Sequence, residues 1–417
     1  MLVHSPSLPL TIDYHSKDGI TAEDEKGILI ALEQRHRVRH LRLSFPVQIL
    51  QKLVMAIDEG FPILEYLIVW PCAKDSSDLV LPETFQAPHL CHLVLSGFTC
   101  PIRSHLHPTA PGLVTLCLIT QHPSAYIQPN ILLQWISFMP RLEYLNIAFT
   151  FPVPNRDMER QLTHTPITTH ITLPNVRVFW FQGICAYLEA VVCRITTPRL
   201  EQLRILLFKQ LTFSVPRLLQ FMNRTENLRF SDAAISFQDK KLHVLYFREA
   251  GAFVFGITVH CWHLSWQVSS AAQISSALSQ VSSAAEHLTL QHKVHSRSSE
   301  EHNDVDCIEW HKLLRSFSNM NTLIIEDGLV EQVSRCLRSE DEDGEIPLEL
   351  LPELQELIYY GSGDAGDEFT SFLDARQNVG RPVTLFRRSP RSTSSKRSSK
   401  APAVTSASSE AGSGPET

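Results

Sequence analysis

The phrase "PRLEYLNI", residues 140–147, recurs along the chain and decides the fold. Each copy opens with proline, and apolar residues follow at its third, sixth and eighth positions. Its seven copies are "PILEYLIV" (62–69), "PHLCHLVL" (88–95), "PGLVTLCL" (111–118), "PRLEYLNI" (140–147), "PNVRVFWF" (174–181), "PRLEQLRI" (198–205) and "PELQELIY" (352–359). Looser copies without the proline are "HRVRHLRL" (36–43), "AAEHLTL" (284–290) and "SNMNTLII" (318–325). Self-similarity at this scale is the mark of a repeat protein.

The phrase has a simple structural meaning. Its last two apolar residues, such as Leu145 and Ile147, lie two apart and therefore share one face of a short strand. The first, Leu142, closes the turn before that strand. Proline fixes φ and has no N–H to donate to a sheet, so it belongs just ahead of the strand. Each phrase therefore predicts one turn and one strand.

The spacing of the phrases leaves room for a helix in each unit. Their first apolar positions, from Val38 to Leu200, are separated by 26, 26, 23, 29, 34 and 24 residues. Apolar residues recur at helical spacing in 47–59, 129–139, 186–195, 215–222, 271–284, 306–317 and 330–337. One strand and one helix per unit predict an α/β leucine-rich-repeat-like solenoid, a horseshoe with a parallel concave sheet and convex helices. An ordinary α/β domain is the alternative, but a generic βαβ fold does not restate one phrase.

Two parts of the chain depart from the repeat. Between about 213 and 268 three β-rich runs lie too close together for helices, which predicts an irregular, hairpin-like section. Within it, "TVHCWHLSW" (258–266) alternates as a strand does. From Arg387 onward the sequence is rich in Ser, Pro, Gly and Ala, with few apolar residues, as in disordered segments. We therefore expect a solenoid over 10–386 and a disordered basic tail over 387–417.

Composition argues against some classes of function and indicates a cellular compartment. The chain is 43% hydrophobic and 19% charged with a net charge of −7; the tail holds six Lys/Arg and two Glu, so the body carries about −11. An acidic body argues against nucleic-acid binding. The N-terminus lacks a signal-peptide pattern, and the most apolar stretch, 250–262, is too short to span a membrane. Nine cysteines without C-x-x-C spacing indicate reduced, intracellular usage, so we expect the cytoplasm or nucleus.

The candidate binding residues are those that alternate with the buried positions of each strand. They project onto the concave face, and Tyr, Trp and Arg, the types that anchor interfaces, are frequent among them. The partner-binding candidates are Tyr66, Ile68, Trp70, His92, Ile119, Tyr144, Asn146, Trp180, Gln182, Arg204, Leu206 and Tyr360, with Val94, Thr115, Val178, Gln202, Glu356 and Ile358 at equivalent positions. The alternative is that the tail or packing between repeats covers these side chains.

No catalytic, cofactor or metal site is predicted. "HSRSSEEHNDVDCIEWH" (295–311) reads as a polar loop in which Asp304 or Asp306 caps a helix, and His89 and His92 lack a second ligand pair. Neither a G-x-S-x-G elbow nor a phosphate-binding G-x-x-x-x-G-K-[ST] loop occurs. Gly361, Gly363 and Gly366 match G-x-G-x-x-G, but acids occupy the phosphate position, so this run is interpreted as a strand-to-helix turn.

Longer stretches resemble a known family. "VPNRDMERQLTHTPI" (153–167), "LPNVRVFWFQGICAYLEAVVCRITTPRLEQLRI" (173–205) and "LPELQELIYYGSGDAGDEFTSFLDARQNVGRPVTL" (351–385) are similar to F-box-type, leucine-rich-repeat-like proteins of mushroom-forming fungi. The resemblance implies that the repeats hold a substrate and that an N-terminal F-box docks onto a cullin–RING ubiquitin-ligase adaptor. No F-box opening precedes "HRVRHLRL", so the chain resembles the substrate-receptor portion only; a truncated gene model and an F-box-less relative would both look like this.

The adaptor is thus an expected partner only if an F-box is supplied. A free-standing repeat scaffold without a ubiquitin connection is the alternative.

Overall fold

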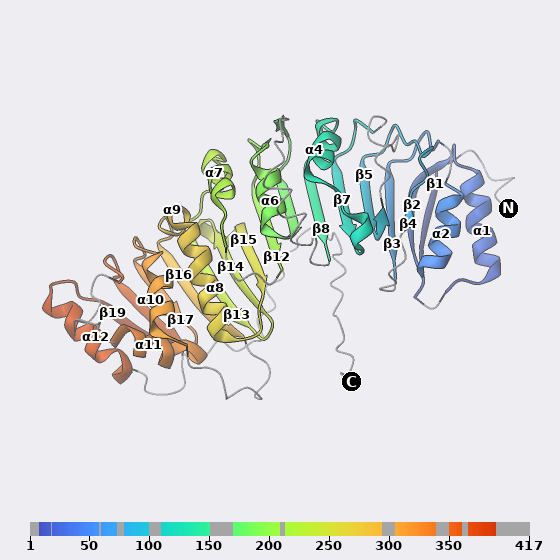
Figure 1. Ribbon diagram of the computed structural model, residues 1–417. Helices are drawn as coiled ribbons and strands as arrows, with labels where there is room; N and C mark the ends of the chain where they lie inside the picture. Colours follow the sequence, from blue (N-terminus) through green and yellow to red (C-terminus); the bar gives the residue numbers. More distant parts are fainter. Residues whose placement is uncertain are drawn as a thin grey trace.

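The protein is built around one large, mostly parallel β-sheet with helices along it (Figure 1). The computed structural model describes residues 8–17, 19–57, 60–72, 79–99, 110–150, 170–208, 213–293, 305–338, 350–360 and 366–388. Within these ranges the fold is mixed α/β, as the sequence predicts. The disordered tail predicted for 387–417 lies outside the described residues, except that the last strand continues through Arg387 and Arg388.

The main sheet has 15 strands, and its order follows the sequence except in one place. From one edge it reads β1 (Leu10–His15), β2 (Val38–Phe45), β3 (Tyr66–Pro71), β5 (His92–Ser96), β7 (Thr115–Thr120), β8 (Tyr144–Phe149), β10 (Val178–Gly183), β12 (Gln202–Leu207), β15 (Phe253–His260), β14 (Lys241–Phe247), β13 (Asp232–Gln238), β16 (His287–Lys293), β17 (Thr322–Ile325), β18 (Glu356–Tyr360) and β19 (Thr384–Arg388). Two short parallel pairs lie apart from it: β4 (Leu79–Val80) with β6 (Phe98–Thr99), and β9 (Ile171–Thr172) with β11 (Ile195–Thr196).

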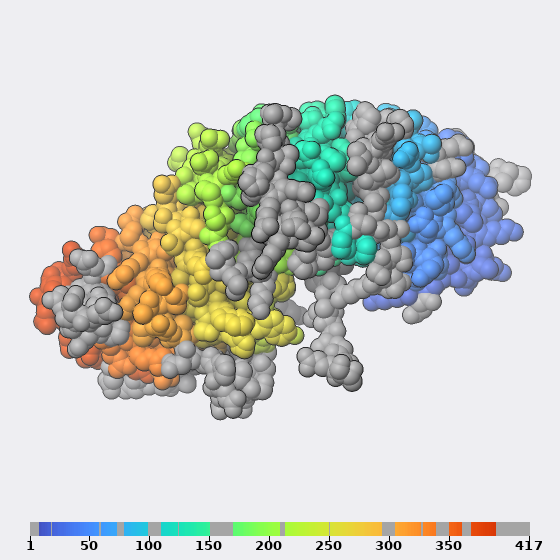
Figure 2. Space-filling view, in the orientation of Figure 1, coloured from blue at the N-terminus to red at the C-terminus, as the bar shows by residue number. Residues whose placement is uncertain are grey.

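Helices follow the strands along one side of this sheet (Figure 1). They are α1 (Ala22–Glu33), α2 (Val47–Met55), α4 (Pro129–Ser137), α6 (Cys185–Val192), α7 (Pro216–Arg224), α8 (Leu264–Ala277), α9 (Ser279–Ser282), α10 (Cys307–Arg315), α11 (Val330–Arg338) and α12 (Gly366–Asn378), with short 3-10 turns at Pro123–Ala125, Glu249–Gly251 and Asp327–Leu329. Successive segments lie next to one another in chain order over most of the molecule (Figure 2). Within the described part of the chain, no helix combines the length and hydrophobicity needed to cross a bilayer.

The proline phrase forms the same local structure in six of its seven copies. In "PRLEYLNI" the N–H of Leu142 donates to the Met139 carbonyl at 3.1 Å, so Pro140 occupies the second position of a β-turn that favours proline. The strand begins four residues after the proline, at Tyr144. The same turn bond closes at Leu64, Leu90, Leu113, Leu200 and Leu354. The phrase therefore predicts both the turn and the strand start.

Neighbouring phrases are joined by one recurring backbone bond ahead of the strands. The N–H of Glu143 donates to the Val114 carbonyl at 2.8 Å, and that of Arg177 donates to the Glu143 carbonyl at 2.9 Å. Behind this ladder, the two strand positions that face the helices are buried: Leu145 is 1% exposed and Ile147 is 2% exposed. The apolar residues of the phrase thus form one continuous core beneath the helices.

The predicted irregular section is confirmed, and its strand order is specific. β13 and β14 form an antiparallel hairpin, β15 returns antiparallel to β14 and parallel to β12, and β13 pairs parallel with β16. Two expectations for this region were wrong. The run 258–266, expected to alternate as a strand, is a strand only to His260, since α8 begins at Leu264. The helix predicted over 271–284 starts seven residues earlier and is interrupted at Leu278.

Candidate binding surface on the sheet

The twelve candidate residues all belong to strands and point away from the helices; we call this side of the sheet the far face. Register arranges eleven of them in three rows across β3 to β12. The rows are Tyr66–His92–Tyr144, then Ile68–Asn146–Trp180–Arg204, then Trp70–Ile119–Gln182–Leu206. Tyr360, the twelfth, lies on β18 beyond the hairpin and is separated from β12 by five strands. The sequence-based set is therefore one contiguous group plus one distant residue.

Stacked rings order the first row. The Tyr66 ring stacks on His92 with centroids 4.3 Å apart, and His40 packs edge-on against Tyr66 at 4.4 Å. His92 Nδ1 lies 3.0 Å from the Thr115 hydroxyl, which extends the row by a hydrogen bond. Burial lowers the pKa of His92, which favours the neutral form of its imidazole. The row is a fixed aromatic strip with hydrogen-bonding edges.

Cations lie against the aromatic rings of the other rows. The Arg42 guanidinium is 4.9 Å from the Trp70 ring centroid and 3.7 Å from an Asp13 carboxylate oxygen. Arg204 similarly lies 4.7 Å from the ring of Phe253. Such contacts limit the rotamers of long side chains before any partner arrives. Arg42 and His40 were missed as candidates, although they occupy the equivalent positions of the proline-free phrase "HRVRHLRL".

Asn146 differs from the expectation that it projects into solvent. It is 6% exposed, and its Nδ2 donates to the Cys117 sulfur at 3.2 Å. Its Oδ1 is buried and has no hydrogen-bond partner among the described residues. Burial also raises the pKa of the Cys117 thiol to about 11 and that of the Tyr144 phenol to about 12. The centre of the far face is thus more enclosed than its ends, and it contains one buried acceptor, Asn146 Oδ1, without a hydrogen bond among the described residues.

The other polar clusters of the sequence are structural where the described residues include them. Asp306 caps α10 by accepting the Ile308 N–H at 3.0 Å, and buried His311 places Nε2 2.7 Å from the Cys336 carbonyl. The remaining ligand candidates, His295, Glu301, His302 and Asp304, lie outside the described residues. Among the described residues no three His, Cys, Asp or Glu side chains are grouped to hold a metal ion. Gly361 and Gly363 are also outside, but the run that contains them joins β18 to α12, as predicted.

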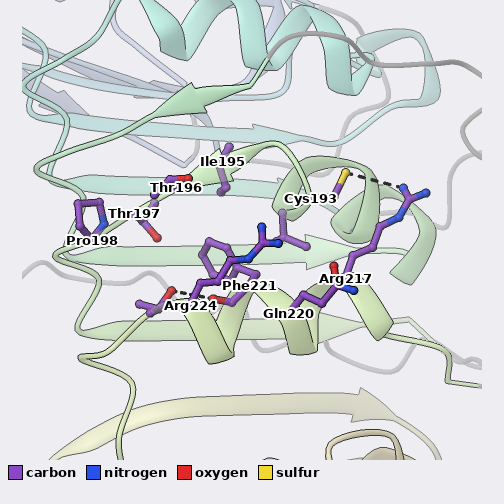
Figure 3. Close-up of a pocket in the computed structure, with 11 residues that line it drawn as sticks. Cys193, Ile195, Thr196, Thr197, Pro198, Arg217, Gln220, Phe221 and Arg224 are labelled. Atoms are coloured by element: carbon purple, nitrogen blue, oxygen red, sulfur yellow. Dashed lines mark hydrogen bonds between the residues drawn. The ribbon is translucent and has the colours of Figure 1, made fainter.

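Cavities lie elsewhere in the molecule. Figure 3 shows a pocket between the end of α6, β11 and α7, where Arg217, Gln220 and Arg224 line one side. Its volume is about 80 Å³. One Arg217 nitrogen is 3.7 Å from the Cys193 sulfur. Sites for drug-sized ligands usually measure about 300–1,000 Å³. A second, open groove of about 660 Å³ lies against α8 and α10. Neither contains a far-face candidate.

Comparison with known proteins returns no match to a family model and none to a curated protein.

Proposed function

We propose that the chain is a leucine-rich-repeat-like solenoid. The proposal is supported by the recurring turn bond, by the backbone ladder that joins successive phrases, and by a sheet order that follows the sequence on both sides of the hairpin. In such a solenoid each unit buries its apolar positions against its neighbours, and the strands form the inner, concave surface. The far face is that surface.

We further propose that the protein is not an enzyme and that its far face binds a protein partner. The observation that carries this proposal is the contiguous set of rings and hydrogen-bonding groups across β3 to β12, already ordered by Tyr66–His92 stacking and by the Arg42–Trp70 contact. Tyr, Trp and Arg dominate binding energy at protein interfaces. Groups held in place before binding lose little entropy when the partner docks.

The narrower role is that of the substrate-receptor portion of an F-box-type ubiquitin ligase. It is supported by the resemblance of 153–167, 173–205 and 351–385 to the fungal F-box-type family. The other role, a scaffold without a ubiquitin connection, uses the same far face. Mixing the purified chain with a purified cullin–RING adaptor tests whether this chain docks onto the ligase by itself. A stable complex on size-exclusion chromatography supports the receptor role for this chain. Failure to form the complex means that the chain alone is not a receptor, and the receptor role then requires an F-box supplied separately.

Site-specific photo-cross-linking tests the binding face itself. A benzophenone amino acid placed at Ile68, in the middle row, is expected to cross-link a partner in extract from the source organism. The matched control places it at Met55, which is 57% exposed on helix α2. Equal cross-linking from both positions, or cross-linking from Met55 alone, would refute the assignment of the far face.

A further inference from the structure

Two tryptophans are held in solvent at the edge of the sheet where β15 ends and α8 begins. Trp262 is 59% exposed and Trp266 is 49% exposed, whereas Trp135 and Trp310 are 4% and 0% exposed. Large aromatic side chains are usually buried, and exposed ones that lie together mark interaction sites. Neither residue belongs to the far-face set.

This edge is structurally fixed. The Gln267 side chain is 2% exposed and donates to the carbonyls of Gln238, at 2.6 Å, and Cys261, at 2.9 Å. The Cys261 N–H in turn donates to the Lys240 carbonyl at 3.2 Å. One buried amide thus ties α8 to the β13–β14 turn and to the segment that carries Trp262. The exposed rings do not belong to a loose loop.

Both indole rings are also positioned by neighbours. Lys240 Nζ lies 4.6 Å from the Trp262 ring centroid, and the His263 ring packs edge-on against Trp266 at 4.7 Å. A cation over one face of Trp262 restricts the ring and leaves a positively charged group beside it. An incoming partner would therefore meet an apolar surface with a cation at its margin.

The charge at this edge is positive. Among the described residues neither Lys240 nor Lys241 forms a salt bridge. Lys241 is aligned with His260 across the β14–β15 pair, and its charge adds to burial in lowering the pKa of that histidine. The nearest acid in sequence is Asp239, so residues 239–241 carry one net positive charge.

We propose that Trp262, Trp266, Lys240 and Lys241, together the tryptophan edge, bind a short acidic protein segment that also carries apolar side chains. Its carboxylates would pair with the two lysines while its apolar side chains pack on the indoles. A nucleic acid or an anionic membrane fits less well, because the chain without its tail has a net charge of about −11 and repels an extended polyanion. A short acidic segment contacts only the positive charge of the tryptophan edge. The inference does not depend on the far-face proposal.

Fluorescence anisotropy of the full-length protein tests this assignment. The probe is a dye-labelled peptide of twelve residues in which Asp and Glu alternate with Leu and Phe, and its comparison peptide carries Lys at every acidic position. We expect the acidic peptide to bind and the lysine peptide not to bind. Trp262→Ala with Trp266→Ala, and separately Lys240→Glu with Lys241→Glu, should each weaken binding about tenfold or more.

Matched controls separate binding from folding. Phe138→Ala removes an aromatic ring that is 50% exposed near the end of α4, and Lys52→Glu reverses an exposed charge on α2; both should leave binding unchanged. Circular dichroism melts establish that each variant is folded. Absence of binding by the wild-type protein, or unchanged binding by both edge variants, overturns the proposal. Tighter binding of a dT20 oligonucleotide or phosphatidylserine vesicles would overturn the assignment to a protein segment. Each of these results leaves the Ile68 cross-linking experiment unaffected.

Discussion

Glu189 on α6 caps the neighbouring helix α7, and replacing it with alanine should destabilise the protein by about 2–4 kcal/mol. Its carboxylate is 8% exposed and accepts the N–H groups of Arg217 at 2.9 Å and Leu218 at 2.8 Å. Both N–H groups belong to the first turn of α7, where no carbonyl of the helix can reach them. Bonds to a charged acceptor contribute roughly 1.5–3 kcal/mol each. The expected loss is smaller than their sum because alanine also removes the unfavourable burial of a carboxylate.

The pH dependence of stability tests the burial of the same carboxyl group. Burial raises the pKa of its carboxyl above the ordinary value of 4.5, against the lowering effect of the two N–H donors. The folded protein therefore holds this proton more tightly than the unfolded chain, so the free energy of unfolding falls as pH rises from about 4.5 through the folded-state pKa. This fall is the cost of ionising a buried carboxyl, and it offsets part of the stabilisation from the two hydrogen bonds. Glu189→Gln should remove that slope from the stability profile.

Urea unfolding and hydrogen exchange measure these effects. Glu189→Ala should lower the free energy of unfolding and speed exchange of the Arg217 and Leu218 amides. The control is Glu201→Ala, which removes a surface carboxylate paired with Arg177 at 2.9 Å and should cost less than about 1 kcal/mol. If Glu189→Ala is no more destabilising than the control, and the two amides stay protected, the capping argument is wrong.

Three further substitutions test other parts of the fold. Arg376 is 1% exposed and donates to three carbonyls around the last proline phrase, so Arg376→Met should cost about 2–4 kcal/mol in chemical denaturation. Burial, with nearby lysines, lowers the pKa of His243 to about 4. The contribution of neutral His243 to stability is therefore present above pH 6.5 and lost as pH falls toward 4. His243→Gln should flatten the pH dependence of the free energy of unfolding between these values. The Tyr187 hydroxyl donates to the Ile127 carbonyl at 2.9 Å inside the core, and Tyr187→Phe should lower the free energy of unfolding by about 1 kcal/mol, whereas no loss would count against that bond.

The regular part of the fold could be predicted because each phrase carries its own local signal. Pro140 and Leu142 define a turn through four consecutive residues, so no distant contact is needed to locate the strand at Tyr144. By contrast α1 and β1 lie where the phrase is absent, and no prediction was made for them. Strand β19 also lacks the phrase, and it extends to Arg388, into the segment predicted to be disordered. The order β12–β15–β14–β13–β16 was also beyond sequence reasoning, because spacing along the chain does not determine which of three nearby strands joins the sheet.

The binding surface could be predicted only in part, for a related reason. Alternation along a strand indicates which side chains share a face, which located Tyr66 and Trp180 correctly on the far face. Exposure depends on neighbours from other strands, so Asn146 proved buried although its position in the phrase predicts otherwise. Trp262 was missed because the strand was expected to continue past His260. Strand β15 instead ends at His260, and Trp262 lies beyond it, exposed to solvent.

The central claim is that the far face captures a protein, and substituting its two tryptophans tests it most directly. Trp70 and Trp180 lie in different rows of the far face and are both partly exposed. The double variant Trp70→Ala and Trp180→Ala should bind the partner cross-linked from Ile68 at least tenfold more weakly, as expected for aromatic anchors, while circular dichroism melts show a folded chain. Unchanged capture by a folded double variant would contradict the claim.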